Sequence, residues 1–107
     1  MPHYMFRASY SQGGLQGVLK EGVAQPRMAV VAGLCTSLGG RLETAYWAFG
    51  SDDFIAIVEL PDDVAAASAA MTVGASGVGS VSTTVLLTAD QVDEARGRRA
   101  AYRAPGA

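Results

Sequence analysis

The chain has 107 residues, of which 50% are hydrophobic and 17% are charged, and its formal net charge is −2 at pH 7. This length suits one domain with one hydrophobic core, and the composition is that of a globular protein rather than a disordered one. The slightly acidic balance excludes a general electrostatic attraction to nucleic acid or to anionic membranes.

The sequence indicates a cytoplasmic protein. Its single cysteine, Cys35, excludes an intrachain disulfide and favours a reducing compartment. Arg7 follows an apolar start instead of preceding a long apolar core, which is unlike a signal peptide or an anchor. The sequence has no uninterrupted apolar run of about 18 residues, so no membrane span is expected. We expect neither nucleic acid nor a membrane among its partners.

The first half of the chain predicts a strand, two helical segments and a second strand. Aromatic residues predict a strand over residues 3–10. Apolar residues at helical spacing predict a short helix over 12–22, weakened by three glycines, and an amphipathic helix over 26–38. The glycines at 39–40 end this helix, and residues 41–49 form the second strand.

The second half of the chain predicts a strand, a helix, another strand and a final helix. A turn at 50–53 precedes a strand over 54–60, so that this strand and the preceding one form a hairpin. Acidic residues open an alanine-rich helix over 61–72, where they favour the helix N-terminus. A glycine-rich link leads to a strand over 81–87, and a capping box begins a final helix at residue 88 that reaches about residue 102.

This order of elements is that of an α+β, ferredoxin-like split βαβ fold with an extra C-terminal helix. Such a fold has a four-stranded antiparallel sheet with helices on one face. We expect one domain over residues 1–102 and a flexible tail over 103–107. The uncovered face is too apolar for water, so a second copy should close over it as a dimeric α/β barrel. A homodimer or a higher homo-oligomer is therefore predicted.

Strict alternation assigns side chains to the two faces of each strand. In the first strand, one face carries His3, Met5, Arg7 and Ser9. In the second strand, alternation separates Leu42, Thr44, Tyr46 and Ala48 from Glu43, Ala45, Trp47 and Phe49.

Two adjacent acids, Asp52 and Asp53, raise the question of a metal site or of an acid/base pair. Neighbouring residues of an extended segment point to opposite faces, so their carboxylates do not normally converge. A turn acid that bonds its own backbone is the simpler interpretation. No metal site is predicted, and Asp53 alone, beside the mouth of the barrel, remains a candidate ligand-binding residue.

Glu59 lies among apolar residues near the end of its strand and therefore needs a partner or an exposed position. Arg7 is the natural partner to expect. If both face the open side of the sheet, they form a structural ion pair or bind a polar ligand, and the sequence leaves both interpretations open.

His3 is the only histidine, which excludes sites that need two histidines from one chain. It is either a general base or a partly exposed residue at the rim of the barrel. Trp47 belongs to an aromatic wall that serves core packing, dimer packing or a flat apolar ligand cavity.

At this point the chain resembles the GYD domain family, small bacterial proteins of the dimeric α/β-barrel group. The resemblance is carried by Tyr-Met-Phe-Arg-Ala-Ser-Tyr-Ser-Gln-Gly-Gly at 4–14, Gly-Gly-Arg-Leu-Glu-Thr-Ala-Tyr-Trp-Ala-Phe-Gly at 39–50, Asp-Asp-Phe-Ile-Ala-Ile-Val-Glu-Leu-Pro-Asp-Asp at 52–63 and Gly-Ser-Val-Ser-Thr-Thr at 79–84. Gly50 and Asp53 match the Gly, Tyr, Asp signature, whereas Asp52 stands where the family usually has tyrosine. Ser82 and Thr84 stand where charged residues are common.

The resemblance implies a ferredoxin-like dimer but no general reaction. Relatives in the wider barrel group include cofactor-free monooxygenases, haem-processing enzymes and simple ligand binders, so the fold does not select among them. We therefore expect a homodimer that binds a small apolar or aromatic ligand without a cofactor. The expected ligand-binding residues are Arg7, Ser9, Trp47, Asp53 and Glu59. The alternatives are a cofactor-independent monooxygenase or isomerase with His3 or Glu59 as base, and a purely structural oligomerisation module.

Overall fold

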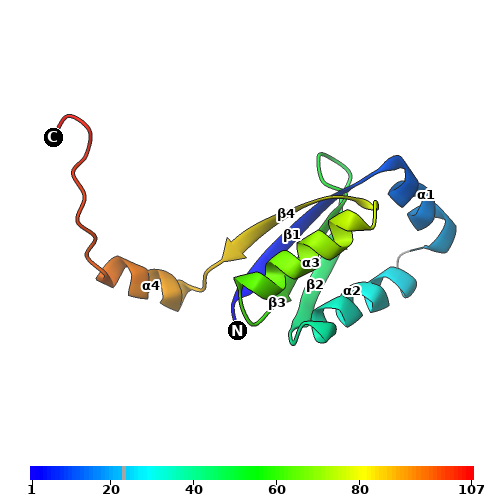
Figure 1. Cartoon of the computed structure of the whole chain (residues 1–107), viewed down its shortest axis with the longest axis horizontal. Helices are drawn as coiled ribbons and strands as arrows, with labels where there is room; N and C mark the ends of the chain where they lie inside the picture. Colours follow the sequence, from blue (N-terminus) through cyan, green and yellow to red (C-terminus); the bar gives the residue numbers. More distant parts are fainter. Residues whose placement is uncertain (23) are drawn as a thin grey trace.

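The computed structural model describes residues 1–22 and 24–107. Its elements follow the predicted order (Figure 1). They are β1 (His3–Tyr10), α1 (Gln12–Glu21), α2 (Pro26–Ser37), β2 (Arg41–Trp47), β3 (Phe54–Glu59), α3 (Asp63–Ala75), β4 (Gly79–Leu86) and α4 (Ala89–Gly97). The four strands form one antiparallel sheet in the order β2-β3-β1-β4. The predicted α+β, ferredoxin-like fold is confirmed.

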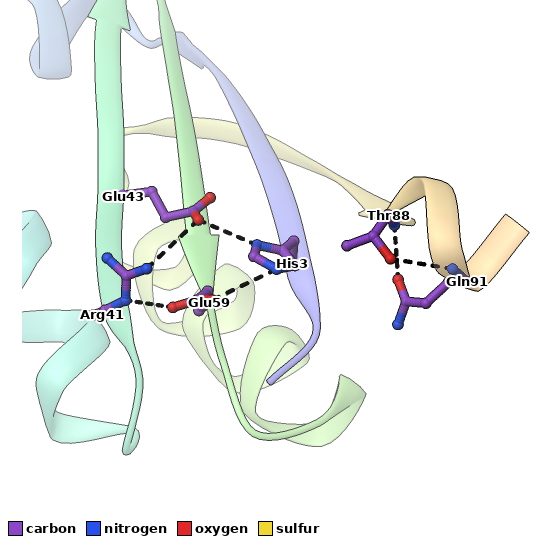
Figure 2. Close-up of polar contacts among 6 residues, drawn as sticks. All are labelled: His3, Arg41, Glu43, Glu59, Thr88 and Gln91. Atoms are coloured by element: carbon purple, nitrogen blue, oxygen red, sulfur yellow. Dashed lines mark hydrogen bonds and ion pairs between the residues drawn. The ribbon is translucent and has the colours of Figure 1, made fainter.

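Local signals in the sequence set where the helices begin. The side chain of Ser11 accepts from the N–H of Gly14 at the start of α1, and that of Asp62 accepts from the N–H of Ala65 at the start of α3. Each cap satisfies a backbone donor that the first helical turn leaves free. At the start of α4, the backbone N–H of Thr88 donates to Oε1 of Gln91 at 2.8 Å, and the backbone N–H of Gln91 donates to Oγ1 of Thr88 at 3.2 Å. These two bonds form the predicted capping box (Figure 2).

The core lies between the sheet and the helices of its covered face. Tyr4, Val58 and Leu60 are its largest fully buried side chains. Tyr4 and Val58 belong to the two central strands, β1 and β3, and Leu60 directly follows β3. In these strands every second side chain points toward the helix layer. Helices α2 and α3 lie over this face, and α1 lies at one end of the sheet (Figure 1). The other face carries no helix among the described residues.

A β-bulge in β2 corrects the predicted division of that strand. Leu42 pairs with Val58 and Thr44 pairs with Ile57, so Glu43 is an extra residue between two paired positions. Leu42, Ala45 and Trp47 consequently pack on the helix-covered core, which strict alternation does not allow. Glu43 and Thr44, although adjacent in sequence, both belong to the uncovered face.

The last helix differs from its prediction in length. It ends at Gly97, not near residue 102, and all of its residues are exposed. A short helix without packing partners depends on its own propensity, and glycine weakens it. Helix α4 and the tail extend away from the sheet (Figure 1), and the chain measures 57 × 33 × 22 Å. No helix in the described residues has the length and apolar character needed to cross a membrane.

Candidate functional site

The uncovered face of the sheet, called the open face below, collects most of the chemically distinctive side chains. It carries His3, Met5, Arg7 and Ser9 from β1, Ile55, Ile57 and Glu59 from β3, Arg41, Glu43, Thr44 and Tyr46 from β2, and Ser80, Ser82, Thr84 and Leu86 from β4. Met5, Ile55 and Ile57 make its centre apolar, and we call these three residues the apolar strip. A polar group lies at each end of this apolar centre.

At one end, His3 lies between two carboxylates (Figure 2). Its Nδ1 is 3.3 Å from Oε1 of Glu43, and its Nε2 is 3.5 Å from Oε1 of Glu59. The Nε of Arg41 pairs closely with Oε2 of Glu59, and its Nη2 lies 3.7 Å from Oε1 of Glu43. We call these four residues the His3 cluster.

The strand register explains why these residues meet. Glu59 is directly opposite His3 in β1 and directly opposite Arg41 in β2, so the three form a row across the sheet. A Cβ on Gly40 would lie 2.0 Å from the Glu59 carbonyl oxygen, so only glycine allows β2 to approach β3 this closely. The bulge then gives Glu43 a place on the same face. Rigid strands therefore hold all four side chains.

The His3 cluster has an uneven charge balance. Glu43 and Glu59 carry two negative charges, and Arg41 supplies one positive charge. The side chains of His3 and Glu43 are 25% and 27% exposed, and that of Glu59 is only 17% exposed. Carboxylates that are partly removed from water need compensating cations. A proton on His3 or an added cation would supply the missing positive charge.

At the other end of the open face, Arg7 is incompletely paired. Its Nη1 lies 3.7 Å from Oδ2 of Asp52, which is too long for a hydrogen bond. Its Nε is buried and finds no hydrogen-bond partner among the described residues. Buried polar atoms are nearly always satisfied by protein or by water, so this donor is available to a further acceptor. Arg7 and Glu59 do not pair, because Arg7 lies opposite Ile55.

Two of the predicted ligand-binding residues secure the loop after β2. Ser9 donates to the carbonyl oxygen of Ser51 at 2.6 Å. The carboxylate of Asp53 accepts from the backbone N–H of Tyr10 at 2.9 Å, and not from its own turn as expected. Both bonds tie the hairpin loop to β1. Their polar atoms are therefore already engaged within the protein.

Trp47 lies on the helix-covered face and is thus separated by the sheet from Arg7 and Glu59. Its Nε1 donates to the hydroxyl oxygen of Tyr10 at 3.0 Å, and its ring centroid is 4.9 Å from that of Phe54. These residues border an apolar cavity of about 90 Å³ between the sheet, α2 and α3. Cys35 lines the same cavity, and burial raises the pKa of its thiol, which keeps it protonated and unreactive.

Arg7, Ser9, Glu59 and His3 thus share the open face, whereas Trp47 and Asp53 have other positions. Arg41 and Glu43 were missed by sequence reasoning. A strand-alternation argument could have found Arg41 once the hairpin register was known. The sequence carries no comparable signal for the bulge that presents Glu43.

A four-stranded antiparallel sheet in the order β2-β3-β1-β4 with helices over one face is the ferredoxin-like arrangement of α+β proteins. The family model of the GYD domain matches residues 4–95, and the chain belongs to the GYD domain family. Neither a curated protein nor a solved structure matches the chain.

Proposed function

We propose that the protein is a cytoplasmic homodimer in which two open faces close over a small apolar or aromatic ligand. The observation that carries this proposal is the buried Nε of Arg7 beside the apolar strip, which has no hydrogen-bond partner among residues 1–22 and 24–107. A guanidinium with free donors suits a carboxylate or another anionic group, because it offers charge and paired hydrogen bonds together. We therefore expect the ligand to carry such a group at one end.

The apolar character of the open face supports a second copy as its cover. Tyr46 is 68% exposed in one chain, and the partly buried Met5, Ile55 and Ile57 lie beside it on the same surface. Contiguous apolar surface on a soluble protein marks an interaction site. A copy that covers this surface would also exclude water from Arg7 and strengthen its interaction with an anionic ligand.

An enzymatic function has one observation in its favour, the contact between His3 Nε2 and Glu59 Oε1. A carboxylate that orients an imidazole is a common arrangement for general-base catalysis. In this chain, however, the second ring nitrogen faces Glu43 as well. Because no nitrogen of His3 is directed at the apolar strip, binding is the better-supported function.

Native mass spectrometry of the protein isolated from its own cells tests both parts of the proposal. We expect the mass of a dimer, with a small molecule retained by the wild type and lost by Arg7→Met. Arg27→Met is the matched control, because Arg27 lines the helix-side cavity instead of the open face. A monomer at micromolar concentration would refute the paired open faces.

A dye experiment tests the ligand chemistry when no molecule is retained. Anilinonaphthalene sulfonate combines an aromatic body with an anionic group, as the proposed ligand does. Arg7→Met should weaken dye binding about tenfold, since a hydrogen bond to a charged group contributes about 1.5–3 kcal/mol. Equal binding by wild type and Arg7→Met, or a loss caused by Arg27→Met instead, would place the dye in the helix-side cavity and reject the proposal.

A further inference from the structure

We infer that His3, Glu43 and Glu59 form a binding site for a divalent transition metal of the Zn²⁺ type. The site needs only one chain and no organic ligand, so it stands independently of the function proposed above. It was not predicted from the sequence, because one histidine and two acids from three separate strands meet only through the sheet register and the bulge.

The donor atoms of the three residues lie close together. One ligand atom from each of the three residues can be chosen so that all lie within 4.8 Å of one another. Nitrogen and oxygen ligands at about 2.1 Å from a tetrahedral Zn²⁺ lie about 3.4 Å apart. The 3.3 Å between Nδ1 of His3 and Oε1 of Glu43 matches that separation, whereas Glu59 approaches the other ring nitrogen, with its Oε1 3.5 Å from Nε2. One ion bound through Nδ1 therefore requires the Glu59 carboxylate to turn toward that nitrogen.

The ligand types select the class of metal. Imidazole nitrogen together with carboxylate oxygen suits Zn²⁺ and neighbouring first-row ions, whereas Mg²⁺ and Ca²⁺ prefer oxygen alone. Three protein ligands leave at least one coordination position for water or another small molecule. Because all three side chains belong to the open face, that position would lie on the same face as the apolar strip.

Arg41 is the competitor of the metal within the site. It pairs with Glu59 and lies near Glu43, so it neutralises one of the two negative charges. A divalent ion with neutral His3 would balance both carboxylates without it. The Arg41 side chain is 61% exposed and lies at the first residue of β2, next to Gly40, so it can move into solvent when a metal binds.

Titration of the tag-free protein with Co²⁺ is the direct test, because bound Co²⁺ has a visible d–d spectrum that reports its ligands. We expect one ion per chain and no sulfur-to-cobalt band, since Cys35 is buried on the other side of the sheet. His3→Ala and Glu59→Gln should each lower the affinity at least about 100-fold, because even outer-shell partners change metal affinity about 10- to 100-fold. Glu94→Gln, on the isolated helix α4, should leave it unchanged.

Arg41→Met separates a metal site from a purely structural ion-pair network. Removing the competing cation should raise the Co²⁺ affinity about two- to fivefold, the equivalent of one exposed ion pair. Zn²⁺ should displace Co²⁺ and return the visible spectrum of the wild type to that of the free aqueous ion. Circular dichroism of each variant shows whether it is folded, and Glu43→Gln provides a third ligand variant of nearly unchanged shape.

Three results would overturn the inference. They are Co²⁺ binding that survives His3→Ala, an affinity that does not respond to Arg41→Met, and a wild type whose d–d spectrum at millimolar Co²⁺ is that of the free aqueous ion. Each is distinguishable from failure of the ligand proposal, because the oligomeric state and the dye binding of Arg7→Met are measured without metal.

Discussion

At the scale of single residues, Tyr4 joins the start of the chain to α3. Its side chain is 1% exposed, and its hydroxyl donates to Oδ1 of Asp63 at 2.6 Å. Burial, followed by the hydrogen bond and the negative charge of Asp63, raises the pKa of Tyr4 from 10.0 to about 12. The folded protein therefore holds the hydroxyl proton more tightly than the unfolded chain does.

The raised pKa of Tyr4 predicts a loss of stability at high pH. The contribution is fully present below pH 10, the unfolded pKa, and is lost as the pH rises from there toward about 12. Tyr4→Phe should lower the free energy of unfolding by about 1 kcal/mol near neutral pH, through loss of the hydrogen bond. In urea titrations this deficit should shrink above pH 10. A deficit that stays constant with pH would contradict the assignment.

The two neighbouring acids of the hairpin loop should differ in effect. Asp53→Ala removes the acceptor of the Tyr10 N–H and should lower the free energy of unfolding by about 1–3 kcal/mol. Asp52→Ala removes only a 3.7 Å contact with a 42% exposed Arg7 and should cost less than about 1 kcal/mol. Chemical denaturation of both variants checks this, and equal losses would show that the loop is not held by Asp53.

At the scale of secondary structure, the elements were predictable and their register was not. Strand β1 and the start of α4 follow from local signals, namely aromatic enrichment and the Thr88–Gln91 capping box. The pairing of Glu59 with Arg41 and His3 depends on how three strands align, and a one-residue shift would change every partner. The expected pair of Arg7 and Glu59 failed for this reason.

The position of Trp47 also could not be predicted from the local sequence. Strict alternation places Trp47 and Leu42 on opposite faces of the sheet. Because the bulge adds one residue between them, both side chains pack on the core. A bulge changes the register without a required residue type at this position. Local sequence therefore identifies the strand but does not assign its faces.

Helix α4 is expected to contribute least to the stability of the fold. All of its residues are exposed, and it extends away from the sheet (Figure 1). Removal of residues 89–107 should therefore change the melting temperature by less than about 4 °C, the shift that about 1 kcal/mol produces in a domain of this size. Thermal unfolding followed by circular dichroism measures it. A larger fall would show that α4 packs against a second copy.

At the scale of the whole molecule, the two faces of the sheet differ in how they are shielded from solvent. Helices α2 and α3 cover one face of the sheet, while the open face presents Tyr46 and the apolar strip to solvent. A partner that covers the open face would also desolvate the His3 cluster at its end. The carboxylates there would then depend more strongly on a compensating cation, because their interaction with water would be lost. Dimerisation and metal binding are therefore expected to favour each other.

Tyr46→Lys tests the proposed dimer without disturbing the fold of one chain, since Tyr46 is already 68% exposed. A lysine there would place an unpaired charge between two apolar faces, and desolvating it costs several kcal/mol. The dissociation constant should rise at least about 100-fold, as about 1.4 kcal/mol corresponds to each factor of ten. Sedimentation velocity measures this change.

Met71→Lys is the matched control for that experiment. Met71 is a similarly exposed apolar residue, 73% accessible, but it belongs to α3 in the helix layer and not to the open face. A new charge there stays in water, so the proposed dimer should persist, and both variants should keep the circular dichroism spectrum of the wild type. If Met71→Lys dissociates the dimer while Tyr46→Lys leaves it intact, the copies meet through their helices. The open face would then be available to other molecules in the assembled protein.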